Sequence, residues 1–397
     1  MAAAPATNRF SALDGWRAVA ALIIALHRLD VEGYHSKLPF VVNSYLFVDF
    51  FFVLSGFVIT HAYWAKLWNV GSFVNFAIRR FGRLWPLHFS MLVAFVLLEY
   101  IQYYFGLGGA NVVDFSDPNQ LLSIASHASL TQALGFTPEF AAQWNVPSWS
   151  ISVEFWTYLV FGLMCIGFRR NFFALACTIV GGSILIIGLF SPNNMHTAFD
   201  YGLARCFAGF FMGYLCYRTW TVYHDDINAA LERFGSTRME IAVVALALVF
   251  VSLAETSMLS LFAPLFFAPL ILVFAFEKGS LSSVMRRPLS VELGALSYSI
   301  YMIALLVVTV IVQAAKQADA RFGFDFIRPR VVEGKTVEWL DIGSPLANDI
   351  FAIGYLVIII LGSFVTYRLI EVPGRRFFNS LASRVIPRPR APVPSAG

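Results

Sequence analysis

Continuous apolar runs of about 20 residues recur along this chain, and they limit what it can fold into. A helix of that length crosses the hydrocarbon core of a bilayer, which is about 30 Å thick. A transmembrane barrel would instead alternate apolar and polar residues in shorter segments. Composition agrees, since 58% of the 397 residues are hydrophobic and only 13% are charged, against about 25% charged in soluble proteins. We therefore expect an all-α, polytopic integral membrane protein.

The apolar runs predict about ten transmembrane helices. Their approximate bounds are 13–29, 41–63, 85–105, 148–168, 172–190, 200–217, 239–255, 258–276, 291–313 and 348–369. Segment 120–135 is apolar but interrupted by polar residues, and we expect it to be re-entrant or interfacial. Asp14 and Arg17 interrupt the approach to the first run, so that run is expected to be an uncleaved span rather than a signal peptide.

The distribution of Lys and Arg predicts which side of the membrane each loop faces. With the N-terminus in the cytoplasm, 20 of the 28 basic residues fall on the cytoplasmic side, seven fall outside, and Arg205 lies within a span. Cytoplasmic loops carry such an excess of positive charge. We therefore expect both termini in the cytoplasm of a bacterial cell, with the protein in its inner membrane. The net charge of +4 offers no argument for nucleic-acid binding.

The regions outside the spans divide the chain further. Two long loops, 106–147 and 314–347, are expected outside, where loops of this length often bind ligands. The tail 379–397 carries four prolines and three arginines, and we expect it to be a disordered cytoplasmic tail after a membrane domain at 1–378. The four cysteines lie in apolar stretches without metal-ligand spacing, so we expect small core residues, no disulfides and no metal site.

Ionisable residues inside apolar runs are costly, and they therefore point to functional positions. His27 lies near the far end of the first span and could serve as a general base, or it could be a plain interfacial histidine. Asp49 lies in a run of aromatic residues and could orient such an imidazole. The following Ser55 and Gly56 suit either close approach of a ligand or helix packing.

Three further positions stand out. Arg79, Arg80 and Arg83 form a cluster that suits phosphates of a cytoplasmic ligand or lipid headgroups, with Arg79 and Arg83 on one helix face. Glu154 lies about two turns into a span, and Arg205 must face the protein interior, where pairing with Glu154 or another acid is the structural alternative.

Taken together, these pieces resemble the acyltransferase-3 family of bacterial membrane O-acyltransferases. The matching segments run in family order along nearly the whole chain: LDGWRAVAALIIALH at 13–27, VDFFFVLSGFVI at 48–59, RRFGRLWP at 79–86, PSWSISVEFWTYL at 147–159, Arg205 with FAGFFMG at 207–213, and YRLIEVPGRRF at 367–377. The motifs of soluble serine esterases, nucleotide hydrolases and zinc proteases are absent from the sequence.

The resemblance implies a ten-helix core that moves an acyl group, usually acetyl, from cytoplasmic acyl-CoA to a hydroxyl of an exported or lipid-linked glycan. It implies the stand-alone type, without a fused extracytoplasmic domain. It assigns the catalytic roles to His27 as base, Asp49 as its partner and Glu154. The implied contacts to the CoA donor are Arg17, Arg79, Arg80, Arg83, Ser55, Gly56, Ser148, Trp149, Ser150 and Arg205.

In one place the sequence departs from the family pattern. The family commonly has ten residues between the basic residue of the first helix and its histidine, whereas nine separate Arg17 from His27 and Arg28 occupies the usual histidine position. One residue turns a helix by about 100°, so His61 and His88 are reserve candidates for the base. Direct transfer and an acyl-enzyme both remain open. A membrane carrier for a glycan or small solute is the alternative function, and a scaffold in a polysaccharide assembly is a third.

Overall fold

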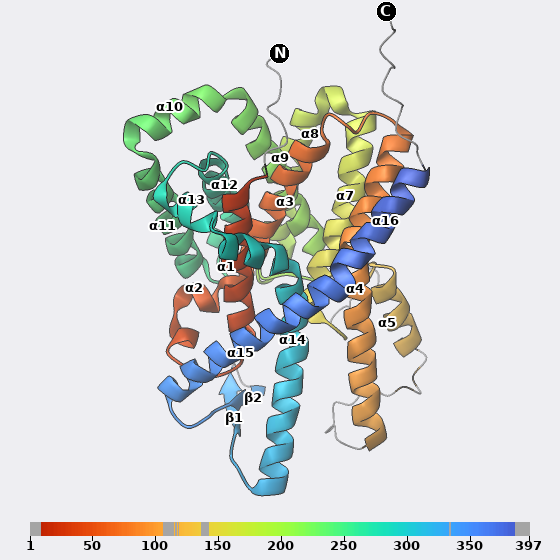
Figure 1. The fold of residues 1–397 in the computed structure, drawn as a ribbon, viewed down its shortest axis with the longest axis vertical. Helices are drawn as coiled ribbons and strands as arrows, with labels where there is room; N and C mark the ends of the chain where they lie inside the picture. Colours follow the sequence, from red (N-terminus) through yellow and green to blue (C-terminus); the bar gives the residue numbers. More distant parts are fainter. Residues whose placement is uncertain are drawn as a thin grey trace, which may run out of the picture.

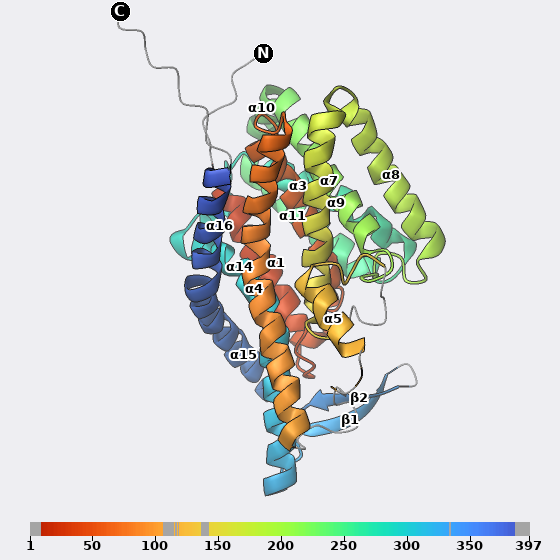
Figure 2. The ribbon, with the colours of Figure 1, turned by 90° about the vertical axis from the view of Figure 1, so that its right-hand side faces the viewer.

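The computed structural model describes residues 9–105, 115, 117, 119–135, 143–332 and 335–385, and all ten expected spans form helices. They are α1 (Ser11–His27), α3 (Phe47–Tyr63), α4 (Val70–Phe105), α7 (Trp149–Gly167), α8 (Phe172–Phe190), α9 (Gly202–Val222), α11 (Ser236–Ala254), α12 (Ala263–Phe274), α14 (Pro288–Phe322) and α15 (Pro345–Thr366). Figure 1 shows them as one bundle, and Figure 2 shows the same bundle from the side. The expected all-α membrane fold is confirmed.

Within the described ranges, seven helical stretches are long and apolar enough to cross a membrane: Ser44–Tyr63, Val70–Phe105, Val146–Gly167, Arg169–Phe190, Ser236–Ala254, Pro288–Phe322 and Pro345–Arg384. The three other expected spans have identifiable reasons for falling short. Helix α1 has 17 residues and includes Asp14 and Arg17. Helix α9 carries Arg205 and Arg218, and α12 with its preceding turn forms only the shorter apolar stretch Met258–Phe274.

The closest packing in the bundle is between α3 and α9, and glycines make it possible. A Cβ on Gly56 would overlap the carbonyl oxygen of Phe210, and a Cβ on Gly213 would overlap the carbonyl oxygen of Val53. Small residues allow helix backbones in membranes to approach this closely. Gly56 therefore faces α9, which agrees with the helix-packing alternative, and its contact with the donor stays a prediction.

Large apolar side chains on the outside of the bundle mark the surface that lipid would cover. Exposed leucine, isoleucine and valine side chains follow one face of each of three outer helices. They include Leu185, Ile186 and Leu189 of α8, Leu246, Val249 and Leu253 of α11, and Ile350, Ile353, Val357 and Leu361 of α15. Soluble monomers rarely expose contiguous apolar surface on this scale.

The two ends of the bundle differ. At the end that we call the terminal end, α1 begins near Arg9 and the last helix, α16 (Val372–Val385), finishes (Figure 1). At the opposite end, here the hairpin end, strands β1 (Ile327–Val332) and β2 (Lys335–Leu340) pair antiparallel with Ile327 opposite Leu340. Helix α14 reaches Phe322, nine residues beyond the expected end of its span, so the expected loop 314–347 is largely helix and hairpin.

Two other expectations need correction: the boundary between the membrane domain and its tail, and the burial of all four cysteines. The proposed boundary at 378–379 falls inside α16, which continues from α15 through a π-helical turn at Tyr367–Glu371. Residues 386–397 of the expected tail lie outside the described residues.

Cys165, Cys206 and Cys216 are buried as expected, but Cys177 is exposed on α8. Within the described part of 120–135, α5 (Asn119–Ala128) has ten residues, about half the length of a span.

Candidate active site

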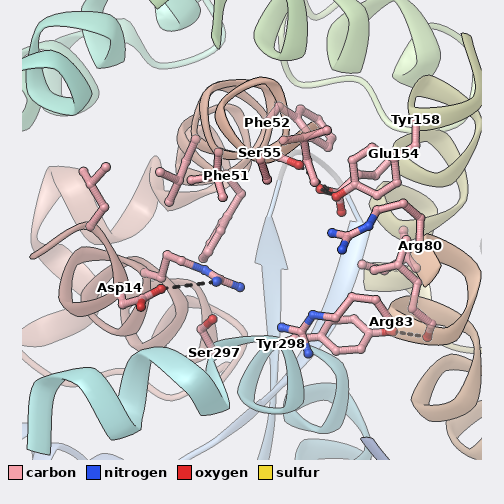
Figure 3. Close-up of a pocket in the computed structure, with 18 of the residues that line it drawn as sticks. Asp14, Phe51, Phe52, Ser55, Arg80, Arg83, Glu154, Tyr158, Ser297 and Tyr298 are labelled. Carbon is pink, nitrogen blue, oxygen red and sulfur yellow. Dashed lines mark hydrogen bonds and ion pairs between the residues drawn. The ribbon is translucent and has the colours of Figure 1, made fainter. Parts of the chain in front are cut away.

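A cavity of about 670 Å³ lies between α1, α3, α4, α7 and α14. It follows α3 from Ala62 at the terminal end to Val48, a distance of about 20 Å along the helix. Figure 3 shows side chains from several helices converging on this space. Its wall is aromatic on the α3 side, where Phe51 and Phe52 line it. The cavity is large enough for part of an extended organic ligand, since small-molecule sites commonly enclose 300–1,000 Å³.

Positive charge predominates among the residues that line the cavity. Six basic side chains face two acidic ones: Arg9, Arg17, Lys66, Arg80, Arg83 and Arg375 against Asp14 and Glu154. Asp14 is engaged at the rim, where it lies 2.6 Å from Arg9 Nε and 3.6 Å from Arg17 Nη1. An excess of arginine around a cleft suits an anionic ligand, above all phosphate groups.

The three arginines of the α4 cluster have different partners. Arg80 and Arg83 line the cavity, whereas Arg79 turns toward α16 and binds the side chains of Asn75, Asn379 and Ser383. Arg79 and Arg83 share a helix face as expected, since Arg83 reaches Glu371 and Arg79 reaches the following α16. Contact of Arg79 with a ligand stays a prediction. The extension of α16 past the expected boundary supplies the partners that hold Arg79 outside the cavity.

Arg83 and Arg80 also differ in how far their charge is already neutralised. Arg83 forms an ion pair with Glu371, whose other carboxylate oxygen accepts a hydrogen bond from Ser299 at 3.2 Å. Glu371 is 1% exposed and stands in the π-helical turn. Arg80 donates one hydrogen bond, from Nη2 to the Tyr63 hydroxyl at 3.2 Å, and its buried Nε has no hydrogen-bond partner among the described residues. Among the described residues Arg83 is thus paired with an acid, whereas no ion pair is formed by Arg80.

Three hydrogen-bonded side chains lie deep in the cavity, and we call them the hydroxyl relay: Ser55, Tyr158 and Glu154. Tyr158 donates its hydroxyl hydrogen to Glu154 Oε1 at 2.6 Å, and Ser55 Oγ lies 2.8 Å from the Tyr158 oxygen. Because the single hydroxyl hydrogen of Tyr158 goes to the carboxylate, Ser55 is the donor in the second bond. Glu154 and Tyr158 are one helical turn apart and share a face of α7. In Figure 3 the Arg80 guanidinium extends toward Glu154.

Asp49 and Arg205 form a separate, fully buried ion pair. Arg205 Nη2 lies 2.7 Å from Asp49 Oδ2, and Arg205 Nε lies 3.0 and 3.2 Å from the two carboxylate oxygens. Arg205 also donates to the carbonyl oxygens of Thr197 at 3.0 Å and Tyr45 at 2.8 Å, and it stacks over Trp149. The acid that pairs with Arg205 is thus Asp49, one of the alternatives expected, and the contacts join Asp49 to Arg205 rather than to His27. Neither residue lines the cavity.

The histidines lie in different environments. His27 is exposed at the last residue of α1, outside the cavity, and no hydrogen bond joins it to Asp49 in the described part of the chain. His61 lines the cavity near its mouth, packed against Phe10 and Trp220. His88 is buried and lies 2.8 Å from the carbonyl oxygen of His127. His27 as the base therefore stays a prediction.

The SWS segment divides between cavity and core. Ser150 lines the cavity, and its Oγ lies 3.1 Å from the Tyr301 hydroxyl. Ser148 is buried against Gln132, and Trp149 packs on Arg205 and Phe52. Ser148 and Trp149 thus pack outside the cavity, and their contact with the donor stays a prediction.

Several cavity residues were missed by sequence reasoning. Tyr158 is the most important of them, and its position four residues after Glu154 could have suggested that the two side chains meet. Arg375 and Lys66 were counted only as positive-inside charges, because nothing in the sequence shows that α16 and the end of α3 meet at one opening.

Comparison with known proteins identifies the family of this chain. A family model described as an acyltransferase domain, that of the acyltransferase-3 family, matches residues 10–368. "Protein 2 in picA locus" of Rhizobium radiobacter is 42% identical over 98 residues, which cover 24% of this chain and 49% of that protein. "Acyltransferase MdmB" of Streptomyces mycarofaciens is 32% identical over 169 residues, 40% of each chain.

These curated relatives are matched over about half of their length or less. No solved structure matches the chain. The family model nevertheless spans all ten membrane helices, from α1 to the end of α15, and it includes the hydroxyl relay and the α4 arginines. This chain belongs to the acyltransferase-3 family.

Proposed function

We propose that this protein transfers an acyl group, in the first instance acetyl, from acyl-CoA to a hydroxyl of an exported or lipid-linked glycan. The observation that carries the proposal is the cavity, which combines an excess of arginine with a serine, a tyrosine and a carboxylate joined by hydrogen bonds. An acyl-CoA has phosphates at one end and a reactive thioester at the other. Membership of an acyltransferase family supports the same reaction class.

In this proposal the donor enters from the terminal end. The distribution of basic residues supports placing that end on the cytoplasmic side of a bacterial inner membrane. Arg9, Lys66 and Arg375 stand with Arg17 on the side where α1 begins, so they would receive the phosphates. The pantetheine arm would follow the aromatic wall of α3 toward the hydroxyl relay. The glycan would approach from the hairpin end, where His27 would serve as base for the acceptor hydroxyl.

The test compares CoA binding by two neighbouring arginines of α4. Arg80→Gln removes a cavity charge that forms no ion pair among the described residues, whereas Arg79→Gln is the matched control on the outer face of the same helix. A hydrogen bond to a charged group contributes about 1.5–3 kcal/mol, so the Kd for CoA should rise about tenfold or more for Arg80→Gln. It should change little for Arg79→Gln, because Arg79 lies outside the cavity and donates to Asn75, Asn379 and Ser383 instead.

The measurement uses purified protein in nanodiscs, with acetyl-CoA and then succinyl-CoA as donors and dephospho-CoA as a probe of the phosphate contacts. Binding of CoA without sensitivity to Arg80→Gln would remove the cavity from the proposal. Absence of both CoA binding and thioester cleavage would favour a carrier for a glycan or small solute over an acyltransferase.

A further inference from the structure

The cavity and His27 lie apart, and this separation bears on how the acyl group moves. The hydroxyl relay lines the cavity, while His27 is exposed at the far end of α1 and does not line it. A direct transfer with His27 as base would need the thioester, the acceptor hydroxyl and the imidazole in contact at once. Reacting atoms must approach to about 3–3.5 Å before reaction. The arrangement of the cavity favours a first step that the relay performs without His27.

Resting on the proposed acyl-CoA donor, we propose that Ser55 is the nucleophile that takes the acyl group and carries it as an ester before the acceptor arrives. Ser55 stands at the midpoint of α3 and lines the cavity with its hydroxyl pointing into the relay. Free serine is a weak nucleophile and needs an adjacent group that accepts its proton. Here the Tyr158 oxygen is 2.8 Å away, and the Glu154 carboxylate is the next acceptor.

The step balances within the groups named. Ser55 Oγ attacks the thioester carbonyl carbon, its proton passes to the Tyr158 oxygen, and the Tyr158 proton passes to Glu154. Collapse of the tetrahedral intermediate breaks the carbon–sulfur bond, and the CoA thiolate takes the proton held by Glu154. The products are acyl-Ser55 and CoA. In the second step the acceptor hydroxyl attacks the ester carbonyl carbon, and the bond between that carbon and Ser55 Oγ breaks. The proton of the acceptor hydroxyl ends on Ser55, so the serine is regenerated.

The surroundings of the relay suit this chemistry. Arg80 stands 6.0 Å from the centre of the Tyr158 ring, so a positive charge faces the groups that become negative during proton transfer. Fixed charges of this kind lower the barrier most where water is scarce. Phe51, Phe52 and Leu54 line the neighbouring wall, and apolar side chains there protect a serine ester from hydrolysis. Tyr158 carries the proton between Ser55 and Glu154.

The experiment measures the first half-reaction without an acceptor, using the full chain in nanodiscs and acetyl-CoA labelled with ¹⁴C in the acetyl group. We expect a burst of free CoA approaching one equivalent of protein, with the label on the peptide that contains Ser55. Ser55→Ala should lose both the burst and the label. The matched control is Ser363→Ala, which removes a buried serine hydroxyl of α15 that lies outside the cavity.

Tyr158→Phe tests the relay separately from folding. Loss of the proton path should slow the burst about 10²-fold or more, the range that general base catalysis spans, while the Kd for CoA stays unchanged. Tyr355→Phe is the control, because it removes a buried hydroxyl that donates to the carbonyl oxygen of Ala25 outside the cavity. His27→Ala should still form the labelled serine, since His27 lies outside the cavity.

Failure of the relay and failure of the proposed function give different results. Transfer of label to a crude lipid-linked glycan extract by Ser55→Ala protein, or loss of the burst in His27→Ala, would overturn the acyl-serine while leaving an acyltransferase. Absence of CoA binding and thioester cleavage with acetyl-CoA and succinyl-CoA would overturn the donor itself, and the acyl-serine with it.

Discussion

The pair of Asp49 and Arg205 predicts an unusual pattern of stability among variants. Arg205→Met leaves the Asp49 carboxylate, which is 0% exposed, without a counter-charge, and it removes the donors to the carbonyl oxygens of Thr197 and Tyr45. Breaking a buried pair by removing one partner costs about 3–5 kcal/mol, and each unsatisfied carbonyl adds about 1–3 kcal/mol. Asp49→Asn alone leaves the charge of Arg205 buried, and it should cost about 3–5 kcal/mol.

The double variant Asp49→Asn with Arg205→Met buries no unpaired charge. Only the two carbonyl groups then remain unsatisfied, at about 2–6 kcal/mol together. Adding Asp49→Asn to Arg205→Met should therefore restore about 3 kcal/mol, so that a second mutation at the site stabilises the protein. If Asp49 acted on His27 instead, Asp49→Asn would change the reaction and leave stability nearly unaltered.

The assay is unfolding of the purified protein in detergent, followed by intrinsic tryptophan fluorescence during titration with denaturant. All four members of the double-mutant cycle are compared under one condition, so that the differences in the free energy of unfolding are meaningful. A double variant that is no more stable than Arg205→Met would refute the reasoning. It would mean that the two side chains do not share a dry site in the membrane-embedded protein.

Three further predictions follow from other contacts. Gly56→Ala should destabilise the packing of α3 on α9, because the new methyl group would overlap the Phe210 carbonyl, and it should lower the yield of folded protein in size-exclusion chromatography without changing CoA affinity in the folded fraction. Glu240→Gln should lower the free energy of unfolding by about 1–3 kcal/mol, because the buried carboxylate accepts from the backbone N–H groups that open α13 (Ser280–Met285). The contacts of Asp341 with the Gly343 N–H and with Arg328 hold the pKa of its carboxyl group below the ordinary 3.8. Its stabilisation of the hairpin end should therefore be complete above that pH, and it should be lost as the pH falls through the lower folded-state pKa. Proteolysis of the hairpin across an acid titration measures this loss.

A different result would contradict each of these three predictions. Normal yield of Gly56→Ala would show that the two helices can separate without loss of the fold. Equal stability of Glu240→Gln and the unaltered protein would show that α13 needs no cap. Acid sensitivity that persists in Asp341→Asn would place the titrating group elsewhere at the hairpin end.

The apolar runs were enough to predict ten helices, because the hydrophobic cost of exposing such segments overrides other local preferences. The partners of the charged residues could not be predicted in the same way. Asp49 and Arg205 lie 156 residues apart, and only the packing of α3 on α9 brings them together. The direction in which each side chain leaves its helix could not be predicted either. Arg79 and Arg80 are adjacent, yet Arg79 faces α16 and Arg80 faces the cavity.

The hairpin was missed for a different reason. Its strands have six residues each and carry charged side chains between apolar ones, which is also typical of a polar loop. Only the pairing of the two strands, which is a property of the folded backbone, distinguishes the two cases. The hydroxyl relay could be predicted in part from the sequence. Ser55 and Glu154 were singled out there, and Tyr158 is the residue that joins them.

The π-helical turn between α15 and α16 bears on how far the functional unit extends along the chain. The family model ends at residue 368, yet Glu371, which neutralises Arg83, and Arg375, which faces the cavity, both come later. A deletion clone cut at the family boundary would lose a carboxylate that is nearly inaccessible to solvent and leave Arg83 with an uncompensated charge. The stretch after residue 368 therefore belongs to the same structural unit as the cavity.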